Sequence, residues 1–265
     1  MTALRFIHLT DTHIATPGET VYGVDPLHVL ETCIERINAD AFGGELCVVT
    51  GDLVHYGAPE RYAALKRALD RLRMPYRLLI GNSDERSLFR SAFPDHPRDE
   101  LGFIQSTFAI GPHRLIFLDT VDTDAAGVLS PERLAWLERQ LGDDRASRSI
   151  LLFMHHPPFE MYSAHQNEMG LRNKDEFLAL IAGRRNIRHI FFGHAHRPIS
   201  GNWRGISFSS LRGMQMACSL VQDAADPALF SCPRGVYACV VVDDKQIIIN
   251  DVDLMIEGTL PFPRT

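Results

Sequence analysis

The sequence predicts an α/β domain, because short apolar segments typical of strands alternate with segments whose apolar residues recur at helical spacing. Five of the strand-like segments are followed within a few residues by Asp, Asn or His side chains. In sheets of this kind, ligands bind beside the carboxyl ends of the strands. We therefore expect these side chains to meet at one edge of the sheet.

The first half of the chain alternates regularly between the two kinds of segment. The apolar segment Phe6–Leu9 predicts a strand that leads to Asp11, and helical spacing of leucine and isoleucine predicts a helix over Leu27–Ile37. The other elements expected here are the strands Leu46–Val49 and Tyr76–Ile80 and the helices Pro59–Leu72 and Asp84–Ala92.

The second half continues this alternation and then becomes rich in strands. Ser130-Pro131 is a typical helix start and predicts a helix that ends at Leu141. The other elements expected here are the strands Arg114–Leu118, Ile150–Met154 and Ile187–Phe192, the helix Lys174–Ile181, and strands within Gly201–Ser210 and Tyr237–Leu254. No internal repeat or low-complexity tract interrupts the chain.

Composition limits the classes of protein that remain. The chain has 265 residues, of which 45% are hydrophobic and 23% charged, enough for one large domain or a domain with a small lobe. The formal net charge of −6 makes a nucleic-acid polymer an unlikely partner. A small anionic substrate fits that charge if bound metal ions supply positive charge locally.

The five cysteines form no Cys-x-x-Cys pair, and their scattered placement is typical of reduced thiols in a cytoplasmic protein. A Cys218–Cys232 bridge is the alternative. No basic and apolar leader opens the chain, and no apolar segment is long enough for a membrane span.

The candidate site residues share a position after strand-like segments and a donor chemistry of oxygen and nitrogen. They are Asp11, His13, Asp52, Asn82, His155, His194 and His196. Carboxylate, amide and imidazole donors suit Mn, Fe, Zn or Co better than Cu(I) or an iron–sulfur cluster. Seven ligands exceed the needs of one four-coordinate ion, but they suit two ions about 3.5–4 Å apart that share a carboxylate.

Each motif taken alone has a simpler interpretation. An isolated Gly-Asp or Gly-Asn is commonly a turn or a helix cap, and the pair His155-His156 before two prolines could merely end a strand. Five such motifs at five strand ends are improbable by chance. The joint pattern therefore favours a metal site.

The run of motifs resembles the calcineurin-like metallophosphoesterases over about residues 5–200. It consists of Asp11-Thr12-His13, Gly51-Asp52, Gly81-Asn82-Ser83-Asp84, His155 and Gly193-His194-Ala195-His196. The resemblance implies a four-layer αββα sandwich. It also implies one metal ion held by Asp11, His13, Asp52 and His196, and another held by Asp52, Asn82, His155 and His194.

Further phrases are similar to the branch of class III cyclic nucleotide phosphodiesterases and bacterial glycerophosphodiesterases. They are Tyr22-Gly23, Gly51-Asp52-Leu53-Val54, Met154-His155-His156-Pro157-Pro158 and Ile190-Phe191-Phe192-Gly193-His194. This resemblance implies in-line attack of a metal-bridging hydroxide on a small phosphodiester, with catalytic roles for Asn82 and His196. It also implies a catalytic core over residues 1–200. Residues 201–265 would complete the sandwich and contribute a cap and a contact within a homodimer or higher homo-oligomer.

Ser83 departs from the family pattern, which has histidine at this position to contact substrate and protonate the leaving oxygen. A serine is a poor general acid, but its hydroxyl can bond a phosphate oxygen, so Ser83 is a candidate for both roles. The alternative is that Ser83 only forms a turn and Asp84 caps the next helix. His55, where the branch often has asparagine, is a second candidate for substrate binding, and His55 or His156 could replace the missing acid.

Three functions remain open from the sequence. The first is a phosphodiesterase for a cyclic nucleotide or a glycerophosphodiester. The second is a phospholipase C-like or phosphomonoesterase activity on another small phosphoester. The third is a catalytically silent metal-binding scaffold, against which the full ligand set argues.

Overall fold

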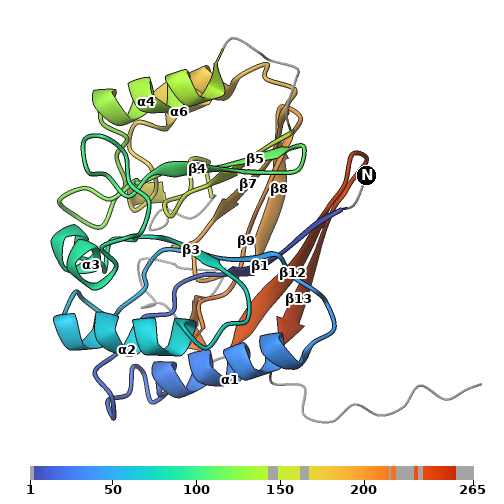
Figure 1. The fold of residues 1–265 in the computed structure, drawn as a ribbon. Helices are drawn as coiled ribbons and strands as arrows, with labels where there is room; N and C mark the ends of the chain where they lie inside the picture. The colour runs from blue at the N-terminus through green and yellow to red at the C-terminus, as the bar shows by residue number, and fades with distance from the viewer. Residues whose placement is uncertain are drawn as a thin grey trace, which may run out of the picture.

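The structure, a computed structural model, describes residues 3–142, 149–161, 167–214, 216–218, 230–231 and 235–254, and it confirms the α/β class. Two sheets carry the fold (Figure 1). The first has the strand order β13 (Ile247–Asp253), β12 (Val236–Val242), β1 (Leu4–Leu9), β2 (Leu46–Thr50) and β3 (Tyr76–Leu79). The second has the order β4 (Ser106–Ile110), β5 (His113–Phe117), β6 (Ser149–Phe153), β7 (Ile187–Phe192), β9 (Ile206–Ser210) and β8 (Ile199–Trp203).

Helices cover the outer face of each sheet. They are α1 (Pro26–Ala39), α2 (Pro59–Leu69), α3 (Arg86–Ala92), α4 (Pro131–Leu141) and α6 (Lys174–Ile181). Figure 1 shows α1 and α2 on one side of the molecule and α4 and α6 on the other. A short ribbon, β10 (Ala217–Cys218) with β11 (Phe230–Ser231), lies outside both sheets.

Three separate hydrophobic clusters establish the layers. One packs α1 and α2 on the first sheet, the second packs α4 and α6 on the second sheet, and the third lies between the sheets. In the middle cluster Phe117, Phe153 and Phe191 stack in series with ring centroids 5.0 Å apart. Phe6 of β1 meets this stack edge-on, at 5.3 Å from Phe191. The arrangement is the four-layer αββα sandwich that the resemblance implies.

Parallel pairing brings the predicted site residues to one edge. Leu9 of β1 pairs with Val49 of β2, so the segments that follow these two strands leave the sheet together. Phe153 of β6 pairs with Phe191 of β7, which does the same for the second sheet. The described part of the chain contains no helix that is both long and apolar enough to cross a membrane.

Some element boundaries differ from the prediction. The strand β4 was not expected, because its alternately half-buried and exposed residues lack a continuous apolar run. Helix α3 begins at Arg86 rather than at Asp84, and α2 ends at Leu69 rather than at Leu72. The expected strand segment Gly201–Ser210 is a hairpin, β8 and β9, that turns at Arg204-Gly205.

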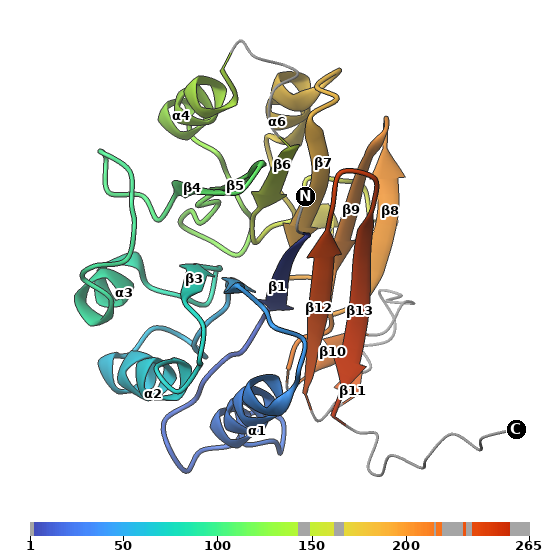
Figure 2. The ribbon, with the colours of Figure 1, turned by 45° about the vertical axis from the view of Figure 1, so that its right-hand side comes forward.

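The C-terminal strands extend the first sheet beside β1 (Figure 2). The boundary at residue 200 and the cap and oligomer contacts of residues 201–265 stay predictions. Cys218 is a free thiol, and Cys232, its proposed partner, lies outside the described residues.

Two buried histidines lie on the strand faces that turn toward the other sheet. The His8 ring bonds the Thr50 hydroxyl at 2.9 Å, and the His189 ring bonds Ser207 and Ser209 at 2.9 and 2.8 Å. Burial, together with the proximity of the two rings for His8, lowers the pKa of each to about 3. Both histidines are therefore neutral in the folded protein near neutral pH.

We predict that acid destabilises the metal-free protein through these two rings. Below pH about 6.5 the unfolded chain binds a proton at each ring, whereas the folded chain does so only near pH 3. Stability therefore falls as pH falls through this window, by up to about 1.4 kcal/mol per pH unit for each ring. Denaturant unfolding from pH 6.5 to 4.5 measures the slope. In the His8→Gln variant the slope should be smaller, and an unchanged slope would contradict the prediction.

Candidate metal centre

Tight turns after five strands carry the candidate side chains into one cluster. The turn after β1 runs beside the turn after β2, with Asp11 N–H donating to Gly51 O at 3.0 Å and His13 N–H donating to Asp52 O at 2.9 Å. Across the two sheets, the His194 N–H donates to both oxygens of Asp11 at 3.1 Å. The cluster therefore joins the first sheet to the second.

The first group consists of Asp11, His13, Asp52 and His196, all buried. One donor atom from each lies within 4.8 Å of the others. The His196 Nε2 atom is 3.2 Å from Asp11 Oδ1 and 3.3 Å from His13 Nε2. Because His196 Nδ1 donates to Met216 O at 3.4 Å, a neutral His196 presents only a lone pair at Nε2.

The second group contains Asp52 again, with Asn82, His155 and His194. His155 Nδ1 donates to Thr50 O at 2.7 Å, so its Nε2 lone pair faces Asn82 Oδ1 at 3.2 Å and Asp52 Oδ1 at 3.5 Å. The His194 ring centroid lies 5.0 Å from that of His155. Three acceptor atoms that face one another are unfavourable unless a cation lies between them, so the donor set fits a metal ion.

Asp52 presents one oxygen to each group. Its Oδ2 atom lies 3.2 Å from His13 Nε2, and its Oδ1 atom lies 3.5 Å from His155 Nε2. Oδ1 also accepts the Ser83 N–H at 2.8 Å, which fixes the carboxylate plane. This is the geometry that a carboxylate shared by two ions requires.

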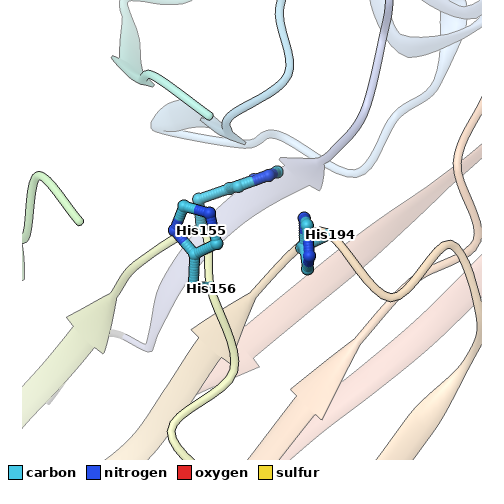
Figure 3. A group of neighbouring side chains, drawn as sticks. All are labelled: His155, His156 and His194. Atoms are coloured by element: carbon cyan, nitrogen blue, oxygen red, sulfur yellow. The ribbon is translucent and has the colours of Figure 1, made fainter. Parts of the chain in front are cut away.

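His156 lies close to His155 and His194, as Figure 3 shows, and the three could by position alone hold an ion. However, the His156 Nδ1 atom accepts from the Thr120 hydroxyl at 2.8 Å, and its Nε2 atom donates to Ala125 O at 3.2 Å. Both ring nitrogens are therefore occupied, and His156 supports the centre as a buried neutral side chain. It is thus poorly placed to act as the replacement acid.

The charges in the centre suit metal binding. Burial alone would raise the pKa of both carboxyl groups, but neighbouring histidines dominate, lowering the pKa of Asp11 to about 2 and that of Asp52 well below its usual range. Burial and the nearby His155 lower the pKa of His194 to about 3. Both carboxylates are ionised and His194 is neutral near pH 7, which are the protonation states that metal ligands need.

The backbone of the centre is unusual. Five of the seven candidate ligands have positive φ angles: Asp11 (51°), His13 (39°), Asp52 (48°), His194 (66°) and His196 (48°). Residues other than glycine rarely adopt this conformation, and it concentrates at functional sites whose surroundings enforce it. The sequence carries no direct signal of it, apart from the glycines Gly51 and Gly193 that stand next to two of these residues, Asp52 and His194.

Asp84 holds the loop that carries Asn82. Its carboxylate accepts the N–H groups of Leu53 and Gly81 at 2.9 Å and the hydroxyl of Tyr62 at 3.0 Å. The interpretation that Asp84 caps α3 is wrong, because Glu85 occupies that position and accepts from Ser87 N and Leu88 N. Burial and the charge of Asp52 raise the pKa of Asp84 to about 7, against the hydrogen bonds that lower it.

The two candidate substrate residues lie beside the centre. The half-buried Ser83 follows Asn82, and among the described residues its hydroxyl has no hydrogen-bond partner. The half-buried His55 ring lies 5.8 Å from the His13 ring. Burial, followed by the charges of His13 and Arg61, lowers the pKa of His55. The structure thus brings all nine candidate residues together, although their roles stay predictions.

The four-layer αββα sandwich, with Asp and His clusters at its strand ends, places this protein in the class of metal-dependent phosphoesterases. The family model described as calcineurin-like phosphoesterase matches residues 4–198, and the chain belongs to this family. It is a phosphodiesterase-type metallophosphoesterase, a hydrolase of a dimetal family.

Known proteins similar to the chain agree with this membership. A probable cyclic nucleotide phosphodiesterase of Rhodopseudomonas palustris is 38% identical over 97% of the chain and 95% of its own length. The glycerophosphodiester phosphodiesterase GpdQ of Enterobacter lignolyticus is 30% identical over 77% of the chain and 75% of its own length. A dimetal phosphatase from Danio rerio has the same fold, with a TM-score of 0.68 at 15% identity, over 95% of this chain and 96% of that one.

We predict that Gly81→Ala disrupts the second group. A Cβ atom at this position would lie 2.3 Å from Asp52 Oδ1 and 2.6 Å from His155 Nε2. The variant should therefore bind at least one metal ion fewer per chain than the parent protein after loading with Mn²⁺, as measured by elemental analysis. Gly44→Ala is the control, because its Cβ would meet the flexible Met74 side chain at 3.3 Å and the Ile7 side chain at an ordinary contact distance of 3.5 Å. Full metal content in Gly81→Ala would contradict the assignment.

Proposed function

We propose that the chain is a dinuclear-metal phosphodiesterase that hydrolyses a small phosphodiester, either a cyclic nucleotide or a glycerophosphodiester. The observation that carries this proposal is Asp52, whose two oxygens face two separate ligand groups. Two ions held on either side of one carboxylate match the clamp used for in-line displacement at phosphorus. The names of the similar proteins support a phosphodiester as the substrate class.

In this proposal Asp11, His13 and His196 hold one ion, Asn82, His155 and His194 hold the other, and Asp52 bridges them. The ions, when bound, supply positive charge to the phosphoryl oxygens and lower the pKa of water. Ions of Mn, Fe, Zn or Co match the oxygen and nitrogen donors of these residues. The neighbouring protein groups keep these ligands in place: Thr50 O orients His155, and the Ser83 N–H orients Asp52.

The substrate side of the centre is formed by Asn82, His196, Ser83 and His55. Asn82 Oδ1 faces the second group, which would leave the amide N–H groups to contact the phosphoryl group. His196, whose Nδ1 donates to Met216 O, would act on the phosphoryl group through the ion that its Nε2 would hold. His55 and the Ser83 hydroxyl lie next to these residues. Because the Ser83 hydroxyl is a weak acid, we expect faster hydrolysis of esters whose leaving group needs no proton. We further propose that the protein is cytoplasmic, which the free, buried thiols Cys33 and Cys47 support, and that it forms a homo-oligomer.

We predict that the Mn²⁺-loaded protein hydrolyses at least one of bis-p-nitrophenyl phosphate, adenosine 3′,5′-cyclic monophosphate and glycerophosphocholine. Asp52→Asn should lower kcat/KM by about 100-fold or more, because it removes the charge shared by both ions. Asp70→Asn is the matched control, since Asp70 pairs with Lys66 on the surface.

The other outcomes separate the alternatives. Hydrolysis of p-nitrophenyl phosphate but of none of the three diesters would identify a phosphomonoesterase. Fewer than one ion per chain after loading, with no hydrolysis of any ester, would identify a scaffold. Either result would overturn the proposed function.

We predict that Ser83→His raises kcat/KM for glycerophosphocholine, whose alkoxide leaving group needs a proton, by about 100-fold, the usual contribution of a general acid. The gain for bis-p-nitrophenyl phosphate should be much smaller, because p-nitrophenolate leaves without a proton. Ser91→His, on the exposed face of α3, is the control. An equal change for both esters would show that position 83 does not donate a proton.

A further inference from the structure

Tyr56 has a highly exposed side chain and a left-handed backbone conformation that its surroundings must stabilise. Among the described residues it has the most exposed of the large hydrophobic side chains, at 67%, and its φ angle is +59°. Single exposed tyrosines are ordinary on protein surfaces. A positive φ at an aromatic residue is uncommon, because its Cβ then crowds the backbone. In the described chain, the residues other than glycine that share this conformation are the five candidate ligands, Tyr22 and Arg204.

Arg61 of α2 enforces the conformation. Its guanidinium donates to the carbonyl oxygens of His55 and, at 3.0 Å, of Tyr56, and it bonds the Thr16 hydroxyl at 3.2 Å. The next residue, Gly57, touches the loop that follows Asn82, since a Cβ there would lie 2.5 Å from the Glu85 Cβ. The Tyr56 backbone is therefore fixed between α2 and the loop that carries two candidate site residues.

The Tyr56 ring lies at the rim of the metal centre. Its centroid is 4.7 Å from that of His55, and the His55 centroid is 5.8 Å from that of His13. The two rings are inclined to one another by 54°, so the mostly exposed Tyr56 ring presents its own face, not a joint flat surface, beside the phosphoester site. The face of a tyrosine ring suits the π-face of a planar heterocycle and offers little to an uncharged glyceryl group.

We propose that Tyr56 is a specificity-determining residue whose ring stacks on the base of a nucleotide substrate bound at the metal centre. The proposal rests on the proposed phosphodiesterase function and narrows it to phosphodiesters that carry an aromatic base. The His55 ring lies beside the Tyr56 ring, and Arg61 positions both residues through their carbonyl groups. The strained conformation of Tyr56 thereby serves substrate selection.

The test compares Tyr56→Gly and Tyr56→Phe with the parent protein, all loaded with Mn²⁺. Glycine adopts a positive φ without strain, so Tyr56→Gly removes the ring and keeps the backbone. We expect Tyr56→Gly to raise KM for adenosine 3′,5′-cyclic monophosphate about 5- to 100-fold, the range for loss of one stacked base. The kcat should stay within about twofold, since a stacking contact is made equally in the ground and transition states.

Two comparisons make the test specific to stacking. For glycerophosphoglycerol, which has neither a ring nor a cation that could bind the ring face, Tyr56→Gly should change KM less than about twofold, and Tyr56→Phe should restore KM for the cyclic nucleotide toward the parent value. Arg204→Ala is the control for an exposed residue with positive φ, and it lies in the β8–β9 turn. Equal effects on both substrates, no effect on either, or a Phe variant that behaves like the Gly variant would each overturn the proposal.

A binding measurement separates this proposal from the proposed function. Calorimetric titration with adenosine 5′-monophosphate should show weaker binding to Tyr56→Gly than to the parent protein, whether or not the parent turns over a diester. A parent protein that hydrolyses no ester but binds the nucleotide through Tyr56 would contradict the phosphodiesterase and uphold the stacking residue. A parent protein that hydrolyses a diester but binds the nucleotide equally well without the Tyr56 ring would uphold the phosphodiesterase and contradict the stacking residue.

Discussion

The structure depends on keeping two ionised carboxylates, Asp11 and Asp52, buried where the two sheets meet. Both are almost fully inaccessible to solvent, and a buried charge without partners is costly. Backbone N–H groups of His194 and Ser83 satisfy part of each carboxylate. The remaining oxygens face imidazole nitrogens that have lone pairs to offer. Cations held between these groups would complete this balance and would couple metal binding to the stability of the sandwich.

The division of the candidate ligands between the sheets would extend this coupling to the core. The first sheet supplies Asp11, His13, Asp52 and Asn82, and the second supplies His155, His194 and His196. The relative position of the two groups is therefore set by the packing between the sheets, above all by Phe6 against Phe153 and Phe191. Because close-packed interiors transmit small shifts, a cavity in this cluster would alter the spacing between the ions.

The sequence predicted the alternation of elements and the meeting of the site residues well, for physical reasons. Apolar segments such as Ile187–Phe192 have only one stable place, inside the sandwich, and parallel pairing then brings the residues that follow them together. Local polar roles were less predictable. Asp84 has a residue type and position typical of a helix cap, but its carboxylate instead bonds Gly81, Leu53 and Tyr62, two of which are distant in the sequence. The strand β4 was missed because it lies at a sheet edge and alternates between half-buried and exposed residues.

The positive φ angles connect these observations to function. A strand that ends in ordinary extended backbone would direct successive side chains to opposite faces, whereas a left-handed residue turns the chain within one or two positions. Both His194 and His196 use this turn, and Ala195 between them is buried. The strain of this conformation is local. The close packing of Gly193 against Thr10, Thr50 and Asp11 maintains the conformation, since any Cβ at position 193 would collide with their atoms. Tyr56 has the same conformation at the rim, where Arg61 holds it, and the proposed stacking on a substrate base would give that conformation a function.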